Sequence, residues 1–187
     1  MTLALPRYLT MAELEAALDT IRDAPKDNGV LELIVRRPQI GAREVIDEGE
    51  LDPVVGLVGD SWSRRGSKRS ADGGPHPDMQ LNIMSARVVA LVAQEKERWP
   101  LAGDQLFVDM DLSEANLPPG TRLKIGTALV EVTAQPHTGC GKFVERFGVD
   151  AMKFVNSMER KDLHLRGINA KVVQRGTIRA GDRVMKI

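Results

Sequence analysis

The residue with the most distinctive chemistry in this chain is Cys140, the only cysteine, within residues 136–143 (Pro-His-Thr-Gly-Cys-Gly-Lys-Phe). Its two glycine neighbours give the thiol little side-chain cover, while His137 and Lys142 are potential cations. Nearby positive charge favours the thiolate, the form that attacks electrophiles and binds soft metals. The alternative is a small buried apolar residue, the usual place of a lone cysteine. The sequence therefore predicts either a reactive thiol or a packing residue.

Sulfur transfer is one reaction that such a thiol can perform, because a thiolate attacks a donor and accepts one sulfur atom. His137 precedes Cys140 by three residues, so a bend can bring its ring to the sulfur as a base or as a cation. The alternative for His137 is a hydrogen-bonded loop histidine. A zinc site would use Cys140, His76, His137 and His164, but their spacing matches no standard zinc pattern.

A basic segment over residues 63–77 has no apolar pattern; it contains three glycines, two prolines, Arg64, Arg65, Lys68 and Arg69. We predict a mobile loop there, either a lid over an anion or a solvated segment. Asp60 and Asp104 each follow a glycine, and we interpret them as turn residues instead of acid–base catalysts. We find no P-loop, dinucleotide-binding fingerprint or Ser-His-Asp signature.

The bulk composition limits the classes of partner. Lys+Arg and Asp+Glu both number 26, and this zero formal charge argues against general affinity for nucleic acid or anionic membranes. Aromatic residues make up 4%, too few for a stacking platform that binds single-stranded nucleic acid. One cysteine excludes an internal disulfide and fits a reducing compartment. With no signal peptide or membrane-spanning apolar run in the sequence, we expect a cytoplasmic protein with one domain over residues 1–187.

Helices and strands are both predicted in the first half of the chain. Thr10 and Glu13 form a capping box before a helical pattern that continues to Ile21. Residues 30–35 are rich in branched side chains and predict a strand. Ser85 is the predicted N-cap of a helix over residues 86–99.

Strands dominate from residue 105 onward, and we predict them over residues 105–108, 121–125, 127–133, 169–174 and 183–187. Gly126 is expected at a tight turn or bulge, and one or two short helices between residues 140 and 157 are expected to break at Gly148. This pattern predicts a mainly β protein with flanking α-helices, arranged as a closed or nearly closed β-barrel.

Several short motifs follow one another in a family-specific order. They are Gly-Asp-Gln-Leu at 103–106, Ser-Glu-Ala-Asn-Leu at 113–117, Gly-Thr-Arg-Leu-Lys-Ile-Gly at 120–126, the segment around Cys140 and Gly-Asp-Arg-Val at 181–184. In this the chain resembles MOSC domains, named for the C-terminal domain of molybdenum cofactor sulfurases. Gly-Leu-Val-Gly-Asp at 56–60 extends the resemblance towards the N-terminus.

The sequence departs from the family pattern at two places. Many MOSC domains carry His-Gly-Gly before the central helix, where this chain has Asp-Gly-Gly-Pro-His at 72–76. Many also carry Gly-Glu-Asn-Leu, where this chain has Glu-Ala-Asn-Leu at 114–117.

The resemblance implies a β-barrel whose cysteine carries sulfur as a persulfide or ligates molybdenum, in relatives that handle the molybdenum cofactor (molybdopterin). Cys140 is then the reacting sulfur or the metal ligand, with His137 as its catalytic neighbour. The sulfur donor would be a separate protein such as a cysteine desulfurase. Two alternatives remain open: a non-catalytic module that binds a pterin or another anion, and a molybdenum-dependent reductase of N-hydroxylated compounds that needs an electron-delivery partner.

A pyranopterin cofactor is anionic because of its terminal phosphate, and guanidinium groups match phosphate oxygens. Lys142 and Arg146, four residues apart, share one side of a helix if a helix begins near Cys140. Arg166 precedes a glycine that would let a ligand approach, and Asn116 and Asn169 would add neutral hydrogen bonds. The alternative is that Arg146 and Arg166 form structural ion pairs.

Overall fold

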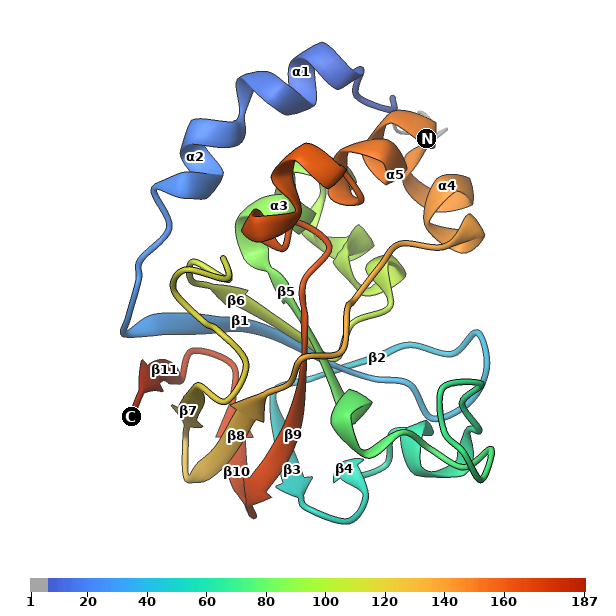
Figure 1. Cartoon of the computed structure of the whole chain (residues 1–187), viewed down its shortest axis with the longest axis vertical. Coiled ribbons are helices and arrows are strands. Elements are labelled where there is room, and N and C mark those ends of the chain that lie inside the picture. Colours follow the sequence, from blue (N-terminus) through green and yellow to red (C-terminus); the bar gives the residue numbers. More distant parts are fainter. Residues whose placement is uncertain (1–6) are drawn as a thin grey trace.

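The computed structural model describes residues 7–187, and its centre is a closed barrel of seven strands (Figure 1). The strands follow one another around the barrel as β1, β11, β7, β8, β9, β5 and β6, which pairs with β1 again. Only the β5–β6 pair among them is parallel within the described residues. The strand bounds are β1 Gly29–Arg36, β5 Leu81–Ser85, β6 Leu106–Asp109, β7 Arg122–Ile125, β8 Ala128–Val132, β9 Ile168–Gln174 and β11 Arg183–Lys186. The predicted mainly β barrel with flanking helices is confirmed.

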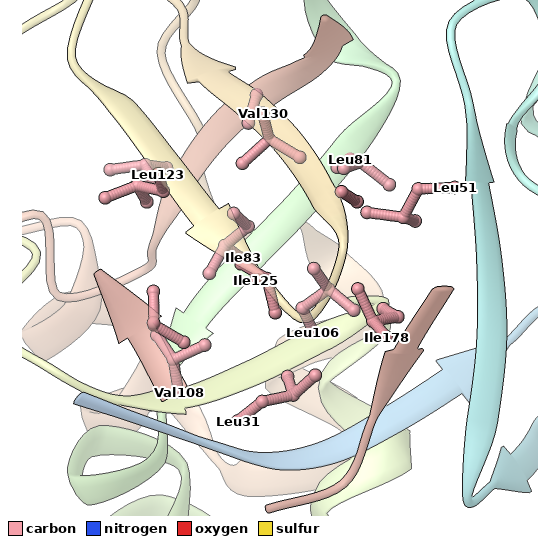
Figure 2. Packing of buried hydrophobic residues seen from close by; sticks show 14 of the residues in the cluster. Leu31, Leu51, Leu81, Ile83, Leu106, Val108, Leu123, Ile125, Val130 and Ile178 are labelled. Carbon is pink, nitrogen blue, oxygen red and sulfur yellow. The ribbon is translucent and has the colours of Figure 1, made fainter. Parts of the chain in front are cut away.

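Alternating side chains fill the barrel. In β7, Leu123 and Ile125 are buried while Arg122 and Lys124 are exposed, as expected for a strand with one face on a core. Figure 2 shows Leu31, Ile83, Leu106, Val130 and other apolar side chains from different strands gathered in the interior. The barrel is therefore a packed core and leaves no channel for a ligand through its middle.

A smaller three-stranded sheet and one extra strand lie beside the barrel. The small sheet has the order β10 (Gly176–Arg179), β3 (Glu48–Asp52), β4 (Gly56–Leu57), and β2 (Glu44–Ile46) pairs with β1. Sequence analysis did not predict β2, β3, β4, β5 or β10 as strands. These strands are short, and Glu48 and Glu50 in β3 are exposed, so their formation depends on pairing with distant segments.

The N-terminal helices bear out the capping box but divide the predicted helix. Thr10 Oγ1 accepts from the Glu13 amide at 3.4 Å, and the Glu13 carboxylate accepts from the Thr10 amide at 2.8 Å. The helical segment is two short helices, α1 (Met11–Ala16) and α2 (Leu18–Arg22), which meet at Ala17.

The predicted helix over residues 86–99 is wrong in its extent. Helix α3 spans Ala86–Ala93 and ends because Gln94 has φ 65°; a 3-10 helix, η3, then covers Lys96–Ala102. Ser85 occupies the N-cap position but makes no capping hydrogen bond. The helix still presents Val88, Val89 and Val92 to a second apolar cluster outside the barrel.

Two helices follow the cysteine segment, α4 (Gly141–Phe147) and α5 (Val149–Val155), and the predicted break at Gly148 is confirmed. Gly148 has φ 90°, and a Cβ atom there would lie 2.9 Å from Cγ of Tyr8. Phe143, Phe147 and Phe154 bury the inner faces of α4 and α5 in the second apolar cluster. The 3-10 helix η4 (Met158–Leu163) then leads back towards β9.

Residues 63–77 run from the 3-10 helix η1 (Trp62–Arg64) to the 3-10 helix η2 (Pro77–Met79), and the part between the two helices consists mainly of turns and bends. One contact of this segment reaches the cysteine region, because Arg69 Nη1 donates to the Pro136 carbonyl oxygen at 3.1 Å. The mobility of the segment stays a prediction.

No helix within residues 7–187 is both long enough and apolar enough to cross a membrane.

Candidate functional site

Cys140 is the N-cap residue of α4, with an extended backbone (φ −125°, ψ 179°). Its carbonyl oxygen accepts from the Phe143 amide at 2.8 Å and so begins the helix. The side chain is exposed, free and makes no capping hydrogen bond. A buried packing role is therefore wrong for this cysteine, and the thiol is open to reaction.

The segment that carries the thiol, residues 133–140, is here called the cysteine strap. Its two ends are anchored to other elements. Asn169 Nδ2 donates to the Gln135 carbonyl oxygen at 3.0 Å, and the Gly139 amide donates to Asn156 Oδ1 at 2.9 Å. Asn156 also donates back to the Gly139 carbonyl oxygen at 3.3 Å. These bonds hold Cys140 at a defined place although its own side chain is free.

His137, in the middle of the strap, belongs to a buried ionic group. Its Nε2 lies 2.7 Å from Oδ1 of Asp104, whose side chain is fully buried. Arg166 Nη1 donates to the two oxygens of the same carboxylate at 2.9 and 2.7 Å. Arg166 Nη2 also donates to the Ala102 carbonyl oxygen at 2.9 Å, and the guanidinium lies 5.1 Å from the centre of the Phe143 ring. Sequence analysis took Asp104 for a turn residue, and that interpretation is wrong.

The charges of this group set the protonation of its members. Burial by itself would raise the pKa of Asp104, but Arg166 and His137 outweigh it and the pKa lies below its usual value. Burial and the positive charge of Arg166 lower the pKa of His137, although Asp104 opposes them. Since an ionised Asp104 can only accept, a neutral His137 carries its proton on Nε2 and leaves Nδ1 bare.

This geometry directs the hydrogen bond of His137 to Asp104 instead of to the thiol. The role of His137 as a base for Cys140 stays a prediction.

A second buried ion pair joins Arg37 and Asp60. Arg37 Nε and Nη2 donate to the two Asp60 oxygens at 2.9 and 3.0 Å, and Arg37 Nη1 donates to the Gly103 carbonyl oxygen at 2.9 Å. Asp60 also accepts from the Trp62 amide at 2.9 Å, as a turn residue does. Burial favours a higher pKa for Asp60, but the contacts with Arg37 outweigh burial and lower it. The turn interpretation of Asp60 was incomplete, because its main partner is Arg37.

Arg65 and Arg43 lie near this pair, and the charge of Arg146 acts on Arg43; we call Arg37, Arg43, Arg65 and Arg146 the arginine cluster. Arg65 Nη2 lies 4.0 Å from Asp60 Oδ1. Burial and the charges of Arg146, Arg37 and Arg65 lower the pKa of Arg43. The described carboxylate that acts on both Arg43 and Arg65 is Asp60, so the cluster carries excess positive charge.

Arg43 is the member of the cluster with an unsatisfied donor. Its Nη1 donates to the Ala42 carbonyl oxygen at 2.6 Å, but its Nε is buried and has no hydrogen-bond partner within residues 7–187. A buried N–H without an acceptor is costly. An anion bound at the cluster would satisfy this donor and balance the charge.

The predicted binding residues fall into three groups. Lys142 is exposed in the first turn of α4, and Arg146 lies in the last turn of the same helix with Nη1 donating to the Leu101 carbonyl oxygen at 2.6 Å. Arg166 and Asn169 are buried supports of the strap and its ionic group. Asn116 bonds to Lys26, Asp111 and Lys186, which belong to neither the strap nor the arginine cluster.

The zinc set of Cys140, His76, His137 and His164 is not assembled. Across residues 7–187, no three His, Cys, Asp or Glu side chains come together as they would around a metal ion. His76 Nδ1 instead accepts from the Asp78 amide at 3.2 Å, and His164 Nδ1 lies 2.9 Å from the Leu112 carbonyl oxygen. Cys140 could therefore serve only as a single protein ligand to a metal that brings other ligands.

Sequence analysis missed Arg37, Arg43 and the importance of Asp104. Asp104 stands in the Gly-Asp-Gln-Leu motif that supported the family resemblance, and that motif was the available signal. Arg37 and Arg43 flank a turn-forming segment with Pro38 and Gly41, and nothing local distinguishes them from surface arginines.

Solved structures share this fold at low sequence identity. The YuaD protein from Bacillus subtilis superposes with a TM-score of 0.63 and 21% identity, covering 84% of this chain and 94% of that one. YiiM from Escherichia coli superposes with a TM-score of 0.53 and 21% identity, covering 84% of this chain and 69% of that one. YiiM from Geobacillus stearothermophilus superposes with a TM-score of 0.51 and 14% identity, covering 88% of this chain and 74% of that one.

No curated protein matches the sequence significantly. The family model of the MOSC domain matches residues 70–185, which hold both the cysteine strap and the Asp104–His137–Arg166 group. The match covers more than half of the chain, and the protein therefore belongs to the MOSC family.

Proposed function

We propose that this protein is a sulfur carrier for molybdenum cofactor chemistry, with Cys140 as the sulfur-bearing residue and the arginine cluster as the anion-binding site. MOSC domains are associated with the molybdenum cofactor. The observation that carries the proposal is an exposed, unbonded thiol at the start of the short helix that also carries Arg146. Arg146 follows Cys140 by six positions, about 9 Å along the helix axis at about 1.5 Å per residue.

The residues of the cluster suit a phosphate-bearing pterin. Arg43 has an unsatisfied buried Nε, and its pKa is lowered first by burial and then by the charges of the other guanidinium groups. A phosphate placed there would accept charge-assisted hydrogen bonds and balance those charges. Lys142, exposed beside Cys140, would add a charge near the reacting sulfur.

Sulfur loading needs only the thiol and a donor. The Cys140 thiolate attacks the outer sulfur of a persulfide on a separate donor protein such as a cysteine desulfurase. A new S–S bond forms on Cys140, the donor's S–S bond breaks, and the donor cysteine leaves as a thiolate. An exposed free thiol of this kind persists in a reducing compartment, which supports a cytoplasmic location.

A bound molybdenum ion would supply redox chemistry, and Cys140 would be its protein ligand. That role belongs to the alternative in which the protein is a reductase served by an electron-delivery partner. The non-catalytic alternative, a module that binds a pterin or another anion, needs the arginine cluster but not the thiol.

Intact mass spectrometry after incubation with a cysteine desulfurase and cysteine tests the proposal. We expect a gain of one sulfur atom that a reductant removes, and no gain in Cys140→Ser. Elemental analysis of the same preparation for molybdenum shows whether Cys140 carries sulfur or ligates molybdenum. Failure of Cys140 to gain sulfur would contradict the carrier role, and molybdenum lost in Cys140→Ser would favour the reductase alternative.

Calorimetry with a pterin phosphate tests the anion site. Arg43→Gln should weaken binding by about 1.5–3 kcal/mol if it removes a charged hydrogen bond. Arg122→Gln is the matched control, because Arg122 lies on the outer face of β7, pairs with Glu131 and is not a member of the arginine cluster. Equal affinity in the two variants would remove Arg43 from the site.

A further inference from the structure

A cavity of about 420 Å³ lies where β8 leaves the barrel and β9 enters it. The cysteine strap forms one wall, and η4 with residues 164–168 forms another; these two connections run above the barrel in Figure 1. Neither Cys140 nor any member of the arginine cluster lines the cavity. Its volume falls in the range of roughly 300–1,000 Å³ that is typical of small-molecule sites.

The floor of this cavity is apolar. Leu117, Val132 and Ile168 line it and are at most 4% exposed, so they belong to the barrel core. Pro136 and Val155 continue the apolar surface on the walls. A ligand would therefore place a hydrophobic body against this floor.

His137 lines the cavity and has one ring nitrogen left as a hydrogen-bond acceptor. It lines the wall, and its Nε2 is engaged by the buried Asp104 carboxylate at 2.7 Å. Arg166 holds that carboxylate ionised, so the ring proton stays on Nε2. Nδ1 has no partner within the described chain and is not an enclosed atom.

His164, on the wall formed by η4 and residues 164–168, has a second such nitrogen. Its Nδ1 lies 2.9 Å from the Leu112 carbonyl oxygen, which can only accept, so Nδ1 carries the proton and the neutral ring leaves Nε2 bare. The backbone of His164 is left-handed (φ 47°, ψ 45°), an uncommon conformation outside glycine that tends to persist where surrounding contacts require it. The Gly167 amide closes the turn by donating to the His164 carbonyl oxygen at 2.7 Å.

The charges at the cavity favour neither a cation nor an anion. Lys161 and Glu114 both line it and oppose each other in sign, and the charge of Arg166 is compensated by Asp104. An anion would find far better partners at the arginine cluster. Among the polar groups that line the cavity, the two bare imidazole nitrogens are hydrogen-bond acceptors without a partner within the described residues, and the buried Arg166 Nε is a donor without one.

We propose that this cavity is a second ligand site, separate from the thiol, for a small uncharged ring compound that donates N–H or O–H groups to His137 and His164. Asp104 is a positioning residue in this site, because it sets which nitrogen of His137 faces the ligand. The site does not depend on sulfur chemistry at Cys140.

Histidine ring nitrogens observed by NMR give a direct test with simple probes. Indole, which has one N–H donor, should bind and shift the ring signals of His137 and His164. 1-Methylindole, which lacks the N–H donor, should bind at least tenfold more weakly than indole. Indole-2-carboxylate should bind no more tightly than indole, because the cavity does not favour an anion. Equal affinity for indole and 1-methylindole, no binding of indole, or shifts confined to other residues would each overturn the proposal.

Variants separate recognition from structural support. His164→Phe keeps an aromatic ring but removes the acceptor. The affinity for indole should therefore fall towards that for 1-methylindole, while the affinity for 1-methylindole stays unchanged. A purely structural role would weaken both probes alike. Asp104→Asn should move the His137 proton to Nδ1 in the spectra and reduce the preference for indole, provided that this variant folds. Cys140→Ser should bind both probes as the unaltered protein does, even if Cys140 proves not to carry sulfur.

Discussion

Replacing Arg166 with Met would leave the buried Asp104 carboxylate without its main partner. Asp104 is fully buried and the Arg166 side chain is 8% exposed, so solvent cannot replace the lost contact. Breaking a buried pair from one side costs about 3–5 kcal/mol. We expect a loss near 3 kcal/mol, because His137 remains 2.7 Å from Asp104 and can partly take over the positive charge.

This change at His137 alters how the stability of the protein depends on pH. In the unaltered protein, the lowered pKa of His137 means that stability falls as pH falls below about 6.5, since the unfolded chain binds a proton that the native ring resists. Without Arg166, burial would still lower the pKa of His137, but Asp104 would oppose it without competition and the folded pKa would rise. The loss of stability as pH falls below about 6.5 would then be smaller than in the unaltered protein.

Urea denaturation at about pH 5.5 and 7.5 measures both effects, on either side of the ordinary histidine pKa. Arg166→Met should be least stable relative to the unaltered protein at the higher pH. The control is Arg122→Met, which breaks an exposed pair with Glu131 and should cost under about 1 kcal/mol. An Arg166→Met loss as small as that of the control, or an unchanged pH slope, would refute the reasoning.

Three further predictions concern other parts of the chain. His137→Gln removes the histidine with a lowered pKa, so urea titrations should show a smaller loss of stability below about pH 6.5 than in the unaltered protein. Gly167→Ala should lower stability by about 2 kcal/mol or more, because φ is 114° and the added Cβ would collide with the Ile83 carbonyl oxygen. Gly181 has φ 94° and open space around it, so Gly181→Ala should lower stability less than Gly167→Ala does; thermal melts of both variants measure the difference. Limited proteolysis should cut first within residues 63–77 and leave the pieces associated, since β1 precedes the segment and the other barrel strands follow it; release of an independently folded C-terminal piece would contradict the single-domain prediction.

The sequence by itself determined the features that depend on local energy. The capping box of Thr10, the break at Gly148 and the alternating strands β7 and β8 all follow from contacts within a few residues. The order of short motifs around Cys140 was enough to identify the family. The glycine neighbours of Cys140 likewise indicated the exposure that the structure shows.

The tertiary structure alone decided which polar residues meet. Arg166 and Asp104 are 62 residues apart in the chain and Arg37 and Asp60 are 23 apart, and the packing of distant elements brings each pair together. Short strands such as β10 form only because a distant partner supplies their hydrogen bonds. Local patterns report which backbone conformation a segment favours, but a buried charge is stable only beside its partner. The partner's position depends on the packing of distant elements, and no spacing in the sequence contains it.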